Sequence, residues 1–366
     1  MRFAILLPLL ALTACEIAPA AVAQALRDPD SALPNWADAD LSWLGDTGDY
    51  AQSQAICASV RGAQPPSVDF PGVHETEALA GCSSRDLWYG IGVEEDRVAA
   101  LQCALLERQR DADTFAADGV SPYPILSGSG ILAMAYANGE GAERDLDIAL
   151  HMACEQQGAP AEMELWITAL DEMRRGVGSE EFAMCDWITS GRAGGVCTAA
   201  FSALAAQERE VEQAAQIARW PAAERAAFRE TLAAFEDYAS AANGMNCWGG
   251  TLHAACVLSG TEEMQARFAD ALLAFAEGRS LPPRVEEPKG DGLAAEDTLV
   301  QAATVTDAQW RAYLKDLYEP DIAEYETHRA DAIAARRAFE PTLVAFAALR
   351  RPDLTAHQVR RIFRSY

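Results

Sequence analysis

Lysine is almost absent from this chain of 366 residues. Only Lys289 and Lys315 occur, and lysines and arginines together number 29 against 55 aspartates and glutamates, so the formal net charge is −26. Nucleic-acid binding needs a basic patch that contacts phosphates, which excludes nucleic acid as the partner. The acidic balance is compatible with a basic protein partner, because opposite net charges speed the encounter of two proteins, but acidity that serves solubility alone explains the charge equally well.

Long apolar runs are also missing, apart from one that covers residues 4–14. That run is shorter than the ~20 residues that cross a bilayer as a helix, so we expect no transmembrane span. With Arg2 before it and Ala21-Val22-Ala23 after it, the run predicts a secretory signal peptide over 1–23. A lipid anchor is the open alternative, because Leu12-Thr13-Ala14-Cys15 has the form of a bacterial lipobox. We therefore expect a periplasmic or secreted protein, or a lipoprotein tethered through Cys15.

The cysteines and histidines of the sequence also lack the spacing of metal ligands. Of the nine cysteines, all but Cys15 lie beyond the signal peptide, and none of these is separated from the next by the ~2–4 residues typical of zinc ligands. The five histidines are scattered, so we expect neither a metal nor a cofactor. Disulfides in an oxidising compartment explain these eight cysteines, an even number, better than a metal site does. Of the many possible pairings, the simplest joins sequence neighbours: Cys57 with Cys82, Cys103 with Cys154, Cys185 with Cys197 and Cys247 with Cys256.

Common enzyme motifs are absent from the sequence, which contains no H-E-x-x-H, no G-x-S-x-G, no P-loop and no dinucleotide fingerprint. Ser127-Gly-Ser-Gly130 lacks the frame of a nucleophile elbow, and Gly90-Ile-Gly92 lacks the third glycine of a nucleotide-binding loop. Carboxylate pairs such as Glu94-Glu95 stand at expected helix starts, where the helix dipole favours them. We therefore expect a protein without catalytic activity.

Alanine is frequent and β-branched residues are sparse, which predicts a mainly α fold. Prolines and glycines over 24–96 indicate an irregular N-terminal segment. We expect a helical region over 97–178 and a second one over 179–366, with a linker at about 280–297, where proline, glycine and charge are concentrated. The fold class is thus a disulfide-stapled helical bundle.

Local signals mark where individual helices begin and end. Pro221 suits the first turn of a helix, and Thr261 suits the N-cap of another. Thr306-x-x-Gln309 and Thr355-x-x-Gln358 have the form of capping boxes. Pro341 predicts an interruption between the two helices that these boxes open.

Residues 127–158 contain the sequence Leu132-Ala-Met-Ala-Tyr136-Ala-Asn-Gly139-Glu-Gly141-Ala-Glu-Arg-Asp145-Leu-Asp-Ile-Ala149. It resembles the Sel-type repeat, a relative of the tetratricopeptide repeat that consists of two antiparallel helices. The resemblance implies a turn at Gly139 and an N-cap at Asp145. Solenoids need at least ~3 repeats, and we find one. We therefore expect a single helical hairpin within a larger helical fold.

Three blocks resemble, in this order, exported bacterial proteins with the LprI-type lysozyme-inhibitor domain, which often follows a Sel-type repeat. They are Cys185-Asp-Trp-Ile-Thr-Ser-Gly-Arg-Ala-Gly-Gly-Val-Cys197, Arg219-Trp-Pro-Ala-Ala-Glu-Arg-Ala-Ala-Phe228 and Gly250-Thr-Leu-His-Ala-Ala255. The likeness covers about 127–278 and, more weakly, 336–354. It departs at 335–341, where the family's closing helix has a tryptophan and no proline. The resemblance implies that 179–366 is an LprI-like domain and that the protein is a lysozyme inhibitor.

A lysozyme cleft holds two carboxyl groups on a basic body. An inhibitor therefore needs a rigid protrusion with a polar or basic tip and acidic surroundings. The segment closed by Cys185 and Cys197 offers such a candidate partner-binding loop at its middle, made of Thr189, Ser190, Gly191 and Arg192. The alternative is that this disulfide only stabilises a turn between helices, with Thr189 as a helix cap. For the function, the alternative is an envelope scaffold that binds another exported protein without inhibiting lysozyme.

Overall fold

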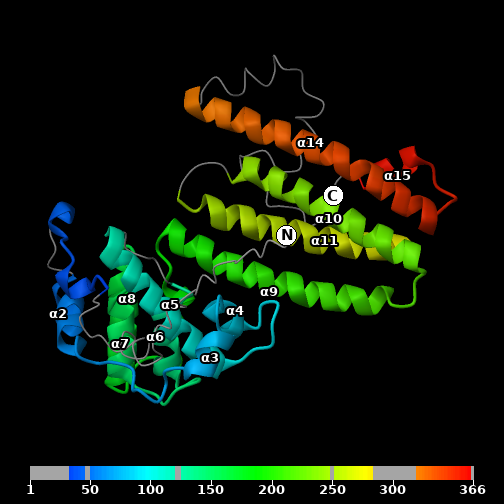
Figure 1. Ribbon diagram of the computed structural model, residues 1–366. Helices are drawn as coiled ribbons and strands as arrows, with labels where there is room; N and C mark the ends of the chain where they lie inside the picture. Colours follow the sequence, from blue (N-terminus) through cyan, green and yellow to red (C-terminus); the bar gives the residue numbers. More distant parts are fainter. Residues whose placement is uncertain (1–32, 46–49, 120–124, 248–250, 283–318, 364–366) are drawn as a thin grey trace, which may run out of the picture.

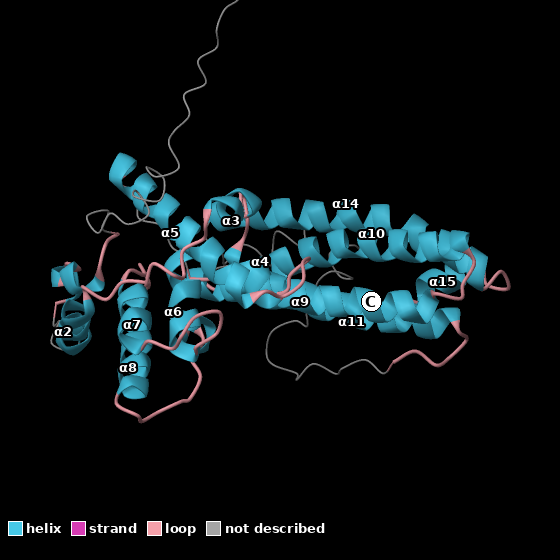
Figure 2. Cartoon of the chain, turned by 60° about the horizontal axis from the view of Figure 1, so that its bottom comes forward, coloured by secondary structure: helices cyan, strands magenta, loops and turns pink. Residues whose placement is uncertain are grey.

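The computed structural model describes residues 33–45, 50–119, 125–247, 251–282 and 319–363. Figure 2 shows only helices and loops in these parts of the chain. The mainly α prediction is confirmed. The predicted signal peptide with Cys15, the capping box at Thr306 and most of the predicted linker lie outside the described residues. No described helix is both long and apolar enough to cross a membrane.

The N-terminal half is a compact group of short helices. It begins with two 3₁₀ turns, η1 (Trp36–Asp38) and η2 (Ser42–Leu44). The α helices that follow are α2 (Ala51–Val60), α3 (Val73–Ala78), α4 (Ser84–Tyr89), α5 (Arg97–Asp118), α6 (Gly128–Asn138), α7 (Leu146–Cys154) and α8 (Pro160–Arg174), and the 3₁₀ turn η4 (Met184–Trp187) closes the group. The segment over 24–96 that we expected to be irregular therefore contains three short helices, because its apolar side chains pack against the helices behind it.

The C-terminal half consists of long helices. They are α9 (Gly191–Ile217), α10 (Ala222–Asn246), α11 (His253–Ala276) and α14 (Glu319–Arg350), followed by the short α15 (Ala356–Ile362). Figure 1 shows the four long helices side by side in the order α14, α10, α11, α9, which agrees with the packing of α10 on α14, α11 on α10, and α9 on α11.

Two hydrophobic cores lie in these halves, and α9 joins them. Near its start, Cys197 and Ala200 belong to the N-terminal core, whereas Ile217 at its end belongs to the C-terminal core. Midway, the Gln207 amide donates to the carbonyl oxygen of Gly90 at 2.9 Å and accepts from the amide of Gly92 at 2.7 Å. One side of α9 is therefore fixed to the N-terminal half.

The expected helical hairpin is present as α6 and α7, which pack on each other between α5 and α8. Gly139 ends α6 in the left-handed conformation, with φ of 72°. The carboxylate of Asp145 caps α7 by accepting from the amides of Asp147 and Ile148, both at 3.0 Å. Every residue of α7 from Ile148 onward is buried, so the hairpin is an internal part of the fold.

The disulfide pattern differs from sequence-neighbour pairing at two bridges. Cys185–Cys197 and Cys247–Cys256 form as predicted. The predicted pairs 57–82 and 103–154 are wrong, because the bridges are Cys57–Cys154 and Cys82–Cys103, with Cα–Cα distances of 5.7 and 6.1 Å. These pairings follow from the tertiary packing, because α2 packs on α7 and α4 packs on α5. Each cysteine therefore lies beside a partner that distance in the sequence does not indicate.

Two predicted helix boundaries are also wrong. Thr261 is not an N-cap, because α11 begins at His253 and continues through it while packing on α9 and α10. Pro341 does not interrupt α14, which runs from 319 to 350. Phe339 and Leu343 are buried on either side of the proline, and their packing keeps the helix continuous. Pro221, predicted in the first turn of a helix, is the N-cap residue directly before α10, and the capping box at Thr355 is confirmed.

Candidate binding surfaces

The predicted partner-binding loop is the start of a helix. The Cys185–Cys197 bridge joins η4 to the first turns of α9, so residues from Gly191 onward are helical. Ser190, not Thr189, is the N-cap, since its hydroxyl accepts from the amide of Ala193 at 3.2 Å. The segment is therefore a connection between η4 and α9 that the disulfide and the helix cap hold in place.

A buried carboxylate holds the backbone of this segment. Glu162, which is fully buried in the first turn of α8, accepts the backbone amides of Thr189 and Ser190 through Oε1, at 2.9 and 2.5 Å. Its Oε2 accepts the amide of Ala159 at 3.1 Å. Buried charges are stabilised when hydrogen bonds satisfy them, and these contacts fix the backbone of the predicted loop against α8.

The second disulfide-closed segment lies against the first. The carbonyl oxygen of Thr251 lies only 1.4 Å from the position that a Cβ on Gly191 would take, so glycine alone fits there. One turn further, Ile188 and Leu252 both lie within 3.7 Å of the corresponding position on Gly194. The 185–197 and 247–256 segments therefore meet as one surface.

Both disulfide-closed segments carry exposed side chains, and we call these the paired-disulfide surface. Trp187 is 37% exposed and Leu252 is 58% exposed, and Thr189, Arg192 and Thr251 are exposed as well. Of the predicted site residues, Thr189 and Arg192 thus lie on the surface, whereas Ser190 is half-buried and Gly191 is buried. Sequence reasoning missed Trp187 and Leu252, although both lie inside the blocks that carry the family resemblance.

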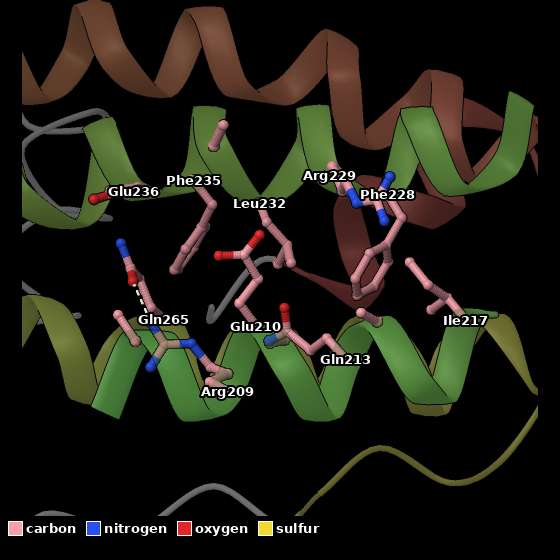
Figure 3. Close-up of a pocket in the computed structure, with 14 residues that line it drawn as sticks. Arg209, Glu210, Gln213, Ile217, Phe228, Arg229, Leu232, Phe235, Glu236 and Gln265 are labelled. Atoms are coloured by element: carbon pink, nitrogen blue, oxygen red, sulfur yellow. Dashed lines mark hydrogen bonds between the residues drawn. The ribbon is translucent and has the colours of Figure 1, made fainter. Parts of the chain in front are cut away.

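A second candidate site is a groove between α9 and α10, with α11 beneath it (Figure 3). Its volume is about 320 Å³. The apolar floor contains the buried residues Ile217, Phe228, Phe235 and Ala269. The polar rims carry side chains of both charges and two amides: Arg209, Glu210 and Gln213 from α9, Arg229 and Glu236 from α10, and Gln265 from α11.

Some of the charged side chains in this groove are already paired with other residues of the chain. Arg209 forms an ion pair with Glu262 and donates to the side-chain oxygen of Gln265 at 2.7 Å (Figure 3), which ties α9 to α11. The side chains of Glu210 and Arg229, in contrast, make no hydrogen bond or ion pair with other described residues. Their charged groups face the groove from opposite helices and are open to a ligand.

A second buried carboxylate, Glu155, lies at the helical hairpin. Arg108 donates to both carboxylate oxygens of Glu155, at 2.7 and 2.5 Å, and the Ser129 hydroxyl donates to Oε2 at 2.6 Å. Burial alone would raise the pKa of the Glu155 carboxyl, but the Arg108 guanidinium outweighs it and the net shift is downward. This is a satisfied internal network. Among the described residues, no group of three or more His, Cys, Asp or Glu is placed to hold a metal ion.

Comparisons of this chain with protein-family models, with curated proteins and with solved structures found no match. The likeness to the Sel-type and LprI-type families therefore stays a prediction from the residues. Four disulfides suit an oxidising compartment.

Proposed function

We propose that this chain is an exported, non-catalytic binding protein of the lysozyme-inhibitor-like class. Its location is the periplasm or the extracellular space, or the membrane surface through a lipid on Cys15. The observation that carries the proposal is the contact between Gly191 and Thr251, which joins two disulfide-closed segments into one surface. A rigid surface binds with less loss of conformational entropy than a flexible loop does.

The exposed side chains of the paired-disulfide surface fit a protein partner. Trp187 and Leu252 offer apolar contact area, and tryptophan is among the residues that contribute most to protein interfaces. Arg192 is exposed in the first turn of α9, and a guanidinium suits the carboxyl groups of a lysozyme cleft. The whole chain carries a net charge of −26, which attracts the basic body around such a cleft.

A second candidate function is an envelope scaffold that binds another exported protein without inhibiting a lysozyme. The observation that favours it is the α9–α10 groove, which has an apolar floor and two charged rim residues that are open to a ligand.

Sedimentation at about 0.15 M salt, where exposed charges are screened over ~8 Å, separates the two functions. The chain from residue 24 onward, with its disulfides formed, is mixed with a basic animal-type lysozyme. The inhibitor proposal expects a one-to-one complex that persists at this salt concentration. No complex, or one that dissociates as salt is added, would overturn it and leave the scaffold.

A further inference from the structure

The α9–α10 groove continues beyond the residues described above. A second hollow of about 280 Å³ shares Ala206, Glu236 and Gln265 with the first. It extends along the same three helices to Ala199 on α9 and Ser240 on α10. The shared residues join both hollows into one long groove, which we call the bundle groove.

The length of the bundle groove suits a helix. It follows α9 from Ala199 to Ile217, which at 1.5 Å per residue is about 27 Å, or about five helical turns. Small residues line much of the α9 side, among them Ala203, Ala206 and Ala214. Small side chains let a helix backbone approach closely, and a partner helix lying between α9 and α10 would complete a four-helix arrangement on α11.

The charges of the bundle groove select the partner. Because Arg209 is paired with Glu262, the remaining charged groups are Glu210 and Glu236 against Arg229. Their excess is acidic, as is the whole chain with its net charge of −26. A guest helix with lysine or arginine facing Glu210 and Glu236 satisfies both carboxylates, and its apolar face covers Phe228 and Leu232.

We propose that the bundle groove is a docking site for a basic amphipathic helix of a partner protein. The site is separate from the paired-disulfide surface, and its existence does not depend on lysozyme inhibition. The guest places apolar residues at i, i+3 or i+4, and i+7 against the floor and basic residues against the acidic rim.

Two synthetic helical peptides of about 18 residues, the number that spans the groove at 1.5 Å per residue, test this proposal. They share one leucine face and carry either lysines or glutamates beside it. Fluorescence anisotropy with the whole chain at about 0.15 M salt measures their affinities. We expect the lysine peptide to saturate at one equivalent and to bind at least about tenfold more tightly than the glutamate peptide, a ratio that corresponds to ~1.4 kcal/mol.

Matched variants locate the binding. Ala206→Trp fills the point where the two hollows meet, and we expect it to weaken the lysine peptide at least about tenfold. Ala226→Trp adds the same side chain at an exposed position of α10 outside the groove and should leave binding unchanged. Because Ala206→Trp could disturb folding, Glu210→Lys at the exposed rim provides a second test and should shift the preference toward the glutamate peptide.

Several outcomes would overturn the proposal. They are the absence of peptide binding to the wild-type chain, equal binding of both peptides, and equal effects of Ala206→Trp and Ala226→Trp. A self-association of the chain that Ala206→Trp abolishes would assign the groove to a second copy and would also contradict the proposed occupant.

Discussion

Gly191 and Thr251, which are distant in sequence, are in such close contact that no side chain fits between them. The carbonyl oxygen of Thr251 stands 1.4 Å from the place of a Cβ on Gly191. Each residue lies within a segment closed by its own disulfide. The contact therefore holds the two disulfide-closed segments together as one rigid surface. The proposed function depends on this relationship.

Substitution of Gly191 by alanine tests the contact. The added methyl group forces the two segments apart, and overpacking of this kind costs about 1–3 kcal/mol of unfolding free energy. Gly195→Ala is the matched control in the same helix, because its nearest neighbour, the Cβ of Ala254, lies at an ordinary 3.4 Å. We expect that control to be neutral or to stabilise by about 0.5–1 kcal/mol, since alanine favours a helix over glycine. Equal denaturant midpoints for the two variants would contradict the account.

Asp111 predicts a stability change with pH. Burial and the neighbouring Glu107 raise the pKa of the Asp111 carboxyl to about 6. Since the pKa in the folded state exceeds that in the unfolded state, the contribution of this group to stability is fully present below about pH 4 and is lost as pH rises through 6. Above pH 6, Asp111→Asn should therefore be more stable than the wild type by about 1 kcal/mol, allowing for the partial exposure of the group.

Unfolding in urea at pH 4 and at pH 7.5 measures this difference. The advantage of Asp111→Asn should be much smaller at the lower pH, because the carboxyl of the folded wild type is neutral there and that of the unfolded chain is only about half ionised. An advantage of the same size at both pH values would mean that the charge of Asp111 is not its cause.

Pro341 lies within α14, where a proline removes one backbone hydrogen bond and crowds the preceding turn. Its side chain is exposed, so replacement by alanine loses no packing. We expect Pro341→Ala to raise the free energy of unfolding by about 1–3 kcal/mol, measured by chemical denaturation. A destabilised variant would show that the proline fits α14 without cost and stabilises the chain through the unfolded state instead.

The disulfide connectivity is open to a direct chemical test. Proteolysis of the oxidised chain without reduction, followed by mass spectrometry, should recover peptides that join Cys57 to Cys154 and Cys82 to Cys103. Peptides that join Cys57 to Cys82 would contradict the packing of α2 on α7, since that packing places Cys57 beside Cys154.

Features that depend on neighbouring residues could be predicted from the sequence. The carboxylate of Asp145 caps α7, and Thr355 and Gln358 form a capping box, because each needs only a backbone amide within three residues. The helical hairpin was expected from the resemblance to the Sel-type repeat. The two short disulfides also agree with sequence-neighbour pairing.

Features that depend on tertiary packing could not be predicted. Nothing near Cys57 in the sequence indicates that its partner is Cys154, 97 residues away. The local signal of Pro341 is overridden because Phe339 and Leu343 pack on either side of it. For the candidate site, the sequence indicated the segment from Thr189 to Arg192. The role of Gly191, however, depends on Thr251, and the bundle groove depends on how α9 and α10 pack on α11.

A lysis assay with two tryptophan variants tests the central claim most directly. The oxidised chain from residue 24 onward is titrated against a basic lysozyme that acts on cell-wall substrate at about 0.15 M salt. Trp187→Ala removes the exposed ring of the paired-disulfide surface, and Trp43→Ala removes a ring that is 70% exposed in η2. We predict inhibition that saturates near one equivalent and that Trp187→Ala weakens at least about tenfold, whereas Trp43→Ala leaves it unchanged. Absent inhibition, or equal inhibition by both variants and the wild type, would contradict the account.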